Sequence, residues 1–104
     1  MAHVYLGLGS NLGNREGNIR KALEALQRAG IMLRAVSPLY ETEPWGVTDQ
    51  PRFLNAACEV ETDYGPHTLL AVLKTIEQEL GRAATVRYGP RPIDLDILLY
   101  DDLC

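Results

Sequence analysis

Two aspartates, Asp94 and Asp96, stand two residues apart in an otherwise apolar stretch that ends at Tyr100. In an extended strand, side chains at this spacing point to one face, and the apolar residues that alternate with them point to the other. Like charges side by side repel, so a cation bound between them is favourable. Mg²⁺ suits the pair because it prefers oxygen ligands and is commonly completed by substrate phosphates. Taken alone, the same spacing is also typical of two solvated aspartates on an edge strand.

A basic segment precedes the two aspartates. It contains Arg82, Arg87 and Arg91, and Tyr88 is followed there by Gly-Pro. The planar guanidinium of arginine offers paired donors to phosphate oxygens, and the flat ring of Tyr88 could stack on a base. A surface loop with ordinary arginines is the alternative, but here the two charge signs are segregated along one short stretch. The segment 88–96 therefore predicts a magnesium and phosphate site that suits a nucleoside triphosphate.

A second set of residues could hold a flat heterocycle. Asn55 interrupts the apolar stretch 53–58, on the face opposite the expected core residues. Its carboxamide offers a donor and an acceptor to an amide-like ring edge, although a solvated surface position is equally consistent with the pattern. Trp45 and Phe53 could wall such a ligand, whereas aromatic residues of a small domain usually belong to its core. For Glu77, the sequence alone favours a solvated helix face.

The glycine-rich run 7–13 matches a dinucleotide-binding fingerprint only in part. Leu12 occupies the third glycine position, and no acidic residue ends a following strand as that motif requires. A phosphate loop with Gly-Lys-Ser/Thr is absent from the sequence. We interpret these glycines as residues that permit a tight turn beside the sheet. The two histidines and two cysteines show no spacing typical of a metal site.

Composition favours one globular domain over residues 1–104. The net charge of −4 argues against broad nucleic-acid binding, which needs Lys and Arg to displace counterions from phosphates. We expect no membrane association, because no apolar stretch approaches the ~20 residues that span a bilayer. The first residues lack a basic region followed by an apolar run, so we expect no secretory signal and a cytoplasmic location.

Hydrophobic periodicity predicts the elements that must position these residues. Either Asn14 or Asn11 can cap a first helix, and Gly30 and Gly81 suit the ends of the two helices. A long loop over 41–51 carries Trp45, and loops of this length are often functional. The expected order is strand 3–9, helix 15–29, strand 31–40, strand 53–62, helix 66–80 and strand 93–100.

That order predicts an α+β fold with a four-stranded antiparallel sheet and both helices on one face. This is the ferredoxin-like βαββαβ arrangement.

Five segments of the chain, in the same order, resemble the 6-hydroxymethyl-7,8-dihydropterin pyrophosphokinase family. The last of them is highly specific, and together they cover nearly the whole chain. They are Leu8–Gly13, Tyr40–Gly46, Phe53–Ala56, Ile76–Glu77 with Leu80–Arg82, and Gly89–Leu99.

The resemblance implies an ATP-dependent transfer of pyrophosphate to the hydroxymethyl group of a dihydropterin, with release of AMP, in folate biosynthesis. It implies that Asp94 and Asp96 hold two Mg²⁺ ions that bridge the ATP phosphates. Arg82 and Arg91 would be catalytic and clamp the phosphates. The implied ATP-binding residues are Glu77, Arg82, Tyr88, Arg91 and Ile97, and the implied pterin-binding residues are Thr42, Pro44, Trp45, Phe53 and Asn55.

This sequence departs from the family pattern at several points. Tyr88 replaces the usual loop Trp, Lys74 stands where Gln is common, and Ala84 stands where a second loop Arg is frequent. The family pattern also continues beyond the last expected strand, whereas this sequence ends at Cys104. One expectation is an enzyme that is either completed by a partner chain, such as a homodimer, or acts only weakly as a fragment. The alternatives are a binding module that holds ATP–Mg or pterin without turnover, and a ferredoxin-like dimerisation domain.

Overall fold

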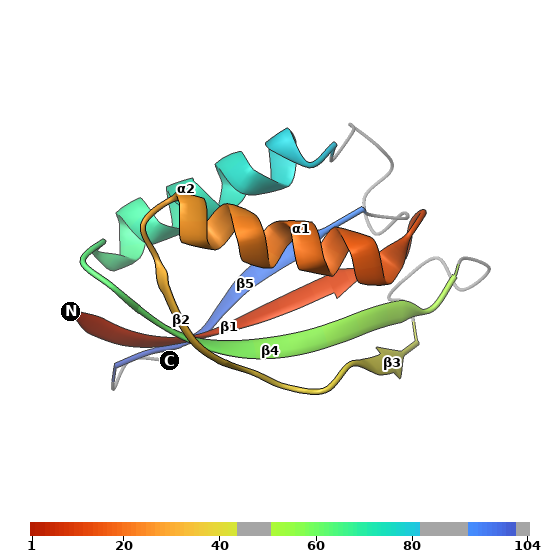
Figure 1. Cartoon of the computed structure of the whole chain (residues 1–104), viewed down its shortest axis with the longest axis horizontal. Helices are drawn as coiled ribbons and strands as arrows, with labels where there is room; N and C mark the ends of the chain where they lie inside the picture. Colours follow the sequence, from red (N-terminus) through yellow and green to blue (C-terminus); the bar gives the residue numbers. More distant parts are fainter. Residues whose placement is uncertain (44–50, 82–91, 102–104) are drawn as a thin grey trace.

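The computed structural model describes residues 1–43, 51–81 and 92–101, which form five strands and two helices (Figure 1). In chain order, the elements are β1 (Ala2–Ser10), α1 (Arg15–Arg28), β2 (Met32–Val36), β3 (Tyr40–Thr42), β4 (Phe53–Thr62), α2 (Pro66–Glu79) and β5 (Asp94–Tyr100).

The strands form one antiparallel sheet in the order β2-β4-β1-β5, and β3 pairs with β4. Both helices cover the same face of this sheet, so the molecule has one helical layer and one open sheet face (Figure 1). The ferredoxin-like α+β fold that the order of elements predicted is confirmed.

The prediction of four strands is wrong, because the expected strand 31–40 is divided into β2 and β3. The division falls at Ser37 and Pro38. Pro38 has no N–H to donate to a ladder. Ser37 donates its backbone N–H to the Ala57 carbonyl at 2.8 Å, and its hydroxyl oxygen accepts from the Ala57 N–H at 2.8 Å. The Ser37 side chain thus replaces one backbone acceptor of the ladder with β4. The chain then pairs with β4 again as the separate strand β3.

Local sequence determines where the helices begin and end. The side chain of Asn14 accepts a hydrogen bond from the Gly17 N–H at 3.0 Å, which confirms one of the two predicted caps of α1. Pro66 occupies the first turn of α2, where no intrahelical donor is needed. Gly30 and Gly81 follow the helices with φ of 86° and 92°, the left-handed conformation that glycine tolerates best.

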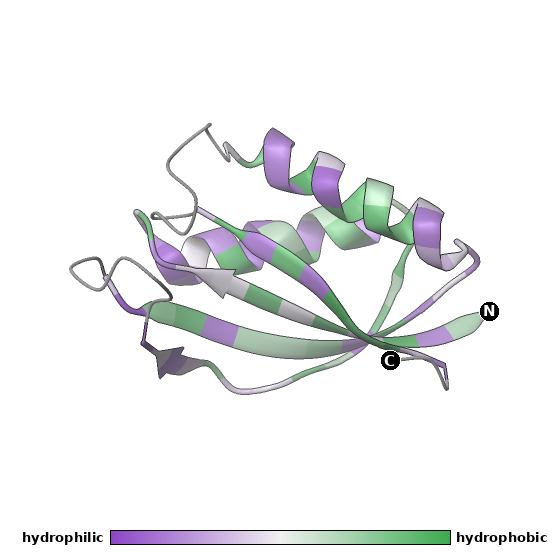
Figure 2. Ribbon diagram, turned by 180° about the vertical axis from the view of Figure 1, so that it is seen from behind, coloured by the Kyte–Doolittle hydropathy of each residue, from purple (hydrophilic) through white to green (hydrophobic). Residues whose placement is uncertain are grey.

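The hydrophobic core lies between the helices and the covered face of the sheet. Hydrophobic and hydrophilic residues alternate along parts of the strands, and β1, β4 and β5 turn alternate side chains towards the core (Figure 2). The short strands β2 and β3 are largely exposed. The buried hydrophobic residues of the three longest strands are Val4, Leu6, Leu8, Ala56, Cys58, Val60 and Leu95, and the helices add the hydrophobic residues Ile19, Ala22, Ala25, Leu26, Leu69, Leu73 and Ile76. The opposite face of the sheet carries polar and small residues together with exposed apolar side chains such as Tyr5 and Leu98.

Neither helix in the described part of the chain is long and apolar enough to cross a membrane.

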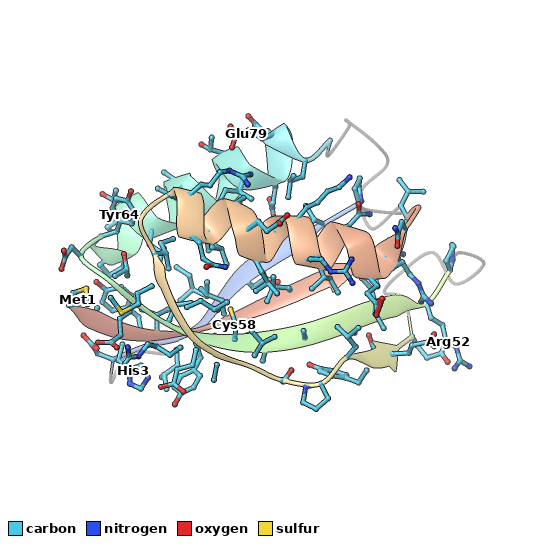
Figure 3. The ribbon with its side chains drawn as sticks, in the orientation of Figure 1. Met1, His3, Arg52, Cys58, Tyr64 and Glu79 are labelled. Atoms are coloured by element: carbon cyan, nitrogen blue, oxygen red, sulfur yellow. The ribbon has the colours of Figure 1, made fainter. Side chains whose placement is uncertain are left out.

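Burial controls the chemistry of Cys58, which lies in the middle of the sheet (Figure 3). Desolvation raises the pKa of its thiol from 9.0 to about 11, and a hydrogen bond with the Leu6 backbone opposes part of this rise. The unfolded chain loses this proton first, near pH 9.0. The contribution to the free energy of unfolding is therefore full below pH 9.0 and is lost as the pH rises towards 11.

We predict slow alkylation of Cys58 at pH 8 in the folded protein, because the thiolate is the reactive form. A C104S variant leaves Cys58 as the single thiol. Its reaction with iodoacetamide should be at least about 100-fold slower in buffer than in denaturant, as expected from the smaller thiolate fraction. Equal rates in the two conditions would contradict the burial of this thiol.

Candidate active site

The register of β1 with its two neighbours assembles a polar group on the open face of the sheet. Gly9 lies opposite Asn55 of β4 on one side and opposite Asp94 of β5 on the other. Gly7 lies opposite Asp96 in the same way. Residues directly opposite each other in an antiparallel pair point to the same face. Since the intervening Leu8 is buried under the helices, Asn55 and both aspartates project from the open face.

A cavity of about 270 Å³ lies on this face and brings the predicted residues together. Both aspartates line it, and Asp94 is half-buried whereas Asp96 is exposed. Three of the residues predicted to bind pterin, Thr42, Phe53 and Asn55, line the same cavity. The remaining lining residues are Gly7, Leu8, Gly9, Tyr40, Ala56 and Leu98.

Two strands orient the carboxamide of Asn55. Its Nδ2 donates to the hydroxyl of Thr42 on β3 at 2.7 Å, and lies 3.5 Å from the Phe53 carbonyl. The ring of Phe53 lies beside the same glycine as the Asn55 amide. A planar ligand edge would thus meet an amide of defined direction next to an aromatic ring.

The two glycines of β1 form the floor of the cavity. A Cβ atom on Gly9 would lie 3.0 Å from Asn55 Oδ1 and 3.4 Å from Phe53 Cδ1. A Cβ atom on Gly7 would lie 3.4 Å from Leu98 Cδ2. Sequence reasoning assigned these glycines to a turn, but both belong to the strand β1, and it is Gly13 that turns the chain with φ of 71°. Residues two positions apart in a strand share a face, so the spacing of Gly7 and Gly9 could have indicated that both lie on the same face of the sheet.

Side chains of α1 and of the loop before α1 bind the chain at Glu41 in β3 and at Pro51 and Arg52, just before β4. Arg15 donates to the Arg52 carbonyl at 2.9 Å and pairs with Glu41 at 3.3 Å. The buried side chain of Asn11 donates to the Pro51 carbonyl at 3.1 Å. Arg52 lies at one end of the sheet and His3 at the other (Figure 3). Since Phe53 follows Arg52, these contacts lie at the end of the sheet that carries Phe53.

Glu77 and Ile97 lie on the helical side of the sheet, outside the cavity. The interpretation of Glu77 as a solvated residue is wrong, because its side chain is only 1% exposed. Its carboxylate accepts a hydrogen bond from the Leu95 N–H at 2.7 Å and pairs with Lys74 at 3.3 Å. The amphipathic pattern of α2 assigned Glu77 to the surface, because a sequence pattern cannot show that a backbone N–H of another element, here that of Leu95, will be buried beside it. Ile97 packs against the core.

Several predicted residues lie outside the described parts of the chain. They are Pro44, Trp45, Arg82, Ala84, Arg87, Tyr88 and Arg91.

The donor set on the open face fits a magnesium ion that is shared with phosphates. Among the residues that the structure describes, no three His, Cys, Asp or Glu side chains gather as an all-protein metal cage would require. Asp94 and Asp96 instead offer two carboxylates on one face, above a floor of glycines. Mg²⁺ is commonly held by one or two carboxylates, with water and substrate phosphates as its other ligands.

Fold and site together define a class of protein: a ferredoxin-like α+β domain whose open sheet face carries an acidic pair and an oriented amide in one cavity. The family model for 7,8-dihydro-6-hydroxymethylpterin-pyrophosphokinase matches residues 5–104. The chain belongs to this family.

Its relatives include proteins of plants and bacteria. A mitochondrial folate synthesis bifunctional protein of Arabidopsis thaliana is 60% identical over 93% of this chain, which spans 18% of that relative. The 2-amino-4-hydroxy-6-hydroxymethyldihydropteridine pyrophosphokinases of Bacillus subtilis and Methylorubrum extorquens are 49% and 48% identical, over 94% and 97% of this chain. The chain spans 59% and 65% of their lengths. It is thus less than two thirds as long as these relatives.

Among solved structures, a prephenate dehydratase from Streptococcus mutans matches with a TM-score of 0.45 and 18% identity, over 93% of this chain and 41% of its own.

We predict that Gly9→Ala disturbs the cavity while the fold is retained. The added Cβ forces the Asn55 amide to move, since 3.0 Å is shorter than an ordinary carbon–oxygen contact. The side-chain amide signals of Asn55 in an NMR spectrum should shift, and the free energy of unfolding should fall by about 1 kcal/mol. Gly7→Ala is the matched control, because its Cβ meets Leu98 at an ordinary contact distance. Identical responses of the two variants would refute the role given to Gly9.

Proposed function

We propose that this chain transfers pyrophosphate from ATP to the hydroxymethyl group of 6-hydroxymethyl-7,8-dihydropterin. The hydroxymethyl oxygen attacks the β-phosphorus and loses its proton. The bond between the β-phosphorus and the oxygen that bridges it to the α-phosphorus breaks, and AMP leaves with that oxygen. The single observation that carries the proposal is the cavity in which an acidic pair and an oriented amide lie on one sheet face.

The pterin side of the proposed site consists of Thr42, Phe53 and Asn55. The Asn55 carboxamide, oriented by the Thr42 hydroxyl at 2.7 Å, can pair with the amide-like edge of a pterin ring. The Phe53 ring offers an apolar wall for the same ring system. Pro44 and Trp45, which lie outside the described residues, complete this side in our proposal.

The nucleotide side begins at Asp94 and Asp96, which would hold Mg²⁺, in our proposal two ions. When bound, Mg²⁺ would neutralise charge on the triphosphate and help to align it. We assign Arg82 and Arg91 to catalysis as phosphate clamps, and Tyr88 to the nucleoside, although all three lie outside the described residues. For Ile97, a contact with ATP stays a prediction from the family resemblance, because its side chain packs against the core.

Positioning is the catalytic contribution that this arrangement supports. Asn55 and Asp94 are separated by the single strand β1, so a pterin and a triphosphate held at these residues would be neighbours. Holding two reactants in one geometry converts an encounter in solution into a step within a complex. The residues lie on strands of one sheet, whose ladders restrict their relative movement.

The names of the relatives agree with this proposal, since two of them are called pyrophosphokinases and one a folate synthesis protein. A homodimer and a cytoplasmic location stay predictions from the sequence.

The direct test is the release of AMP from ATP by the purified 104-residue chain with the hydroxymethyl-dihydropterin and Mg²⁺. Release that requires both additions supports the proposal. Binding of ATP–Mg or of pterin without AMP release would favour a binding module. A dimer with no magnesium-dependent affinity for ATP would favour a dimerisation domain.

We predict that Asp96→Ala abolishes the magnesium-dependent part of the ATP affinity, because one of two carboxylate ligands is lost. Calorimetric titration with ATP at saturating Mg²⁺ measures this loss. Asp63→Ala serves as the control, since Asp63 is 87% exposed and lies outside the cavity. An Asp96 variant with the affinity of the unsubstituted chain would contradict the metal assignment.

We predict that Asn55→Ala weakens pterin binding by about tenfold or more, the loss expected when one partner of a hydrogen-bonded ring edge is removed. ATP affinity should be unchanged, because Asn55 lies on the other side of β1 from the aspartates. Gln78→Ala removes an exposed carboxamide from α2 and is the control. Equal losses for pterin and ATP would mean that the pocket is misassigned.

A further inference from the structure

Glu77 is a buried carboxylate that the cavity on the open face does not use. It lies on α2, within the helical layer, and its side chain is 1% exposed. Burying a charge is costly unless the charge is paired and hydrogen-bonded. A glutamate buried at this position therefore needs hydrogen-bond or charged partners that offset the free-energy cost of its burial.

The two carboxylate oxygens of Glu77 meet different partners. Oε2 accepts the Leu95 N–H at 2.7 Å, and Oε1 lies 3.3 Å from the Lys74 ammonium, one turn earlier on α2. Lys74 is 47% exposed, so its charge remains in contact with water while it orients the carboxylate. The hydrogen bond from Leu95 is the shorter of the two contacts, and a bond of this length is typical of a carboxylate acceptor.

Leu95 is the residue between the two aspartates of the candidate site. Its side chain is fully buried, and in the register of β5 with β1 it lies opposite Leu8. Among the described strands, β5 has β1 as its neighbour and therefore stands at an edge of the sheet. An edge strand leaves alternate N–H groups without a strand partner, and a buried N–H needs another acceptor. Glu77 supplies one.

We propose that Glu77 is a positioning residue, which anchors the Leu95 backbone to α2 and so directs Asp94 and Asp96 together onto the open face. This role rests on the proposed function of the two aspartates as holders of Mg²⁺ and nucleotide. It differs from the direct contact with ATP that the family resemblance implied for Glu77. The carboxylate acts through the strand, from the opposite side of the sheet.

The first measurement is amide hydrogen exchange at Leu95 in the metal-free protein. Glu77→Ala removes the acceptor, so exchange at Leu95 should become about tenfold faster or more, as expected for the loss of a charge-assisted hydrogen bond. Glu77→Gln keeps one acceptor oxygen and should give an intermediate rate. Glu79→Gln is the matched control, because Glu79 is exposed on the same helix, away from the sheet (Figure 3).

The second measurement is calorimetric titration of the same variants with α,β-methylene-ATP, with and without Mg²⁺. The analogue is stable at the bond that the proposed reaction breaks. The magnesium-dependent affinity should follow the exchange protection, highest in the unsubstituted chain, lower in Glu77→Gln and about tenfold or more reduced in Glu77→Ala. Affinity without Mg²⁺ should be the same in all, because the aspartates act on the nucleotide through the metal.

The outcomes separate the two proposals. If the unsubstituted chain shows no magnesium-dependent affinity for the analogue, the proposed function falls, and the positioning role with it. If it binds and the Glu77 variants bind equally well despite faster exchange at Leu95, only the positioning role falls. A loss of affinity in Glu77→Gln with full protection at Leu95 would overturn it in favour of direct contact. If Glu77→Ala does not fold, Glu77→Gln alone carries the test.

Discussion

The antiparallel register of β1 with β4 and β5 is the constraint on which the candidate site depends. Gly9 is opposite both Asn55 and Asp94, and Gly7 is opposite Asp96. A slip of one residue would turn every side chain of a strand to the other face and carry the aspartates into the core. Burial prevents such a slip, because Leu8 and Leu95 are buried under the helices at 2% and 0% exposure. Hydrophobic packing on one face therefore sets the polar arrangement on the other.

The two-layer architecture explains why the polar residues remain accessible. Both helices pack on the same face of the sheet, so the other face stays open (Figures 1 and 2). The site residues lie on that open face. The central strand contributes glycines there, and its neighbours contribute an amide and two carboxylates. Because glycine has no side chain, the central strand becomes the floor of a cavity whose walls are the side chains of the flanking strands.

Buried polar side chains hold the backbone next to the site. Asn11 donates to the Pro51 carbonyl, two residues before Phe53, and Glu77 accepts from the N–H between the two aspartates. Both are fully buried or nearly so. Each connects a backbone group to an element far away in the sequence, so the geometry of the site and the packing of the core share the same bonds. A change in either residue is thus expected to affect stability and ligand affinity together.

The sequence by itself determined the two helices and the residues that end them, the ferredoxin-like order of elements and the shared face of Asp94 and Asp96, because these patterns act between residues a few positions apart. It left the cap of the first helix open between Asn14 and Asn11. It also pointed to Thr42, Phe53 and Asn55, through motifs that resemble a family. Only the tertiary structure decided that Ser37 bonds to Ala57 and divides a strand, that Gly7 and Gly9 form a cavity floor, and that Glu77 is buried against Leu95. In each of these cases the partner is distant along the chain or lies across the sheet. Glu77 and Leu95, for example, are 18 residues apart. A pattern of neighbouring residues cannot show such a contact.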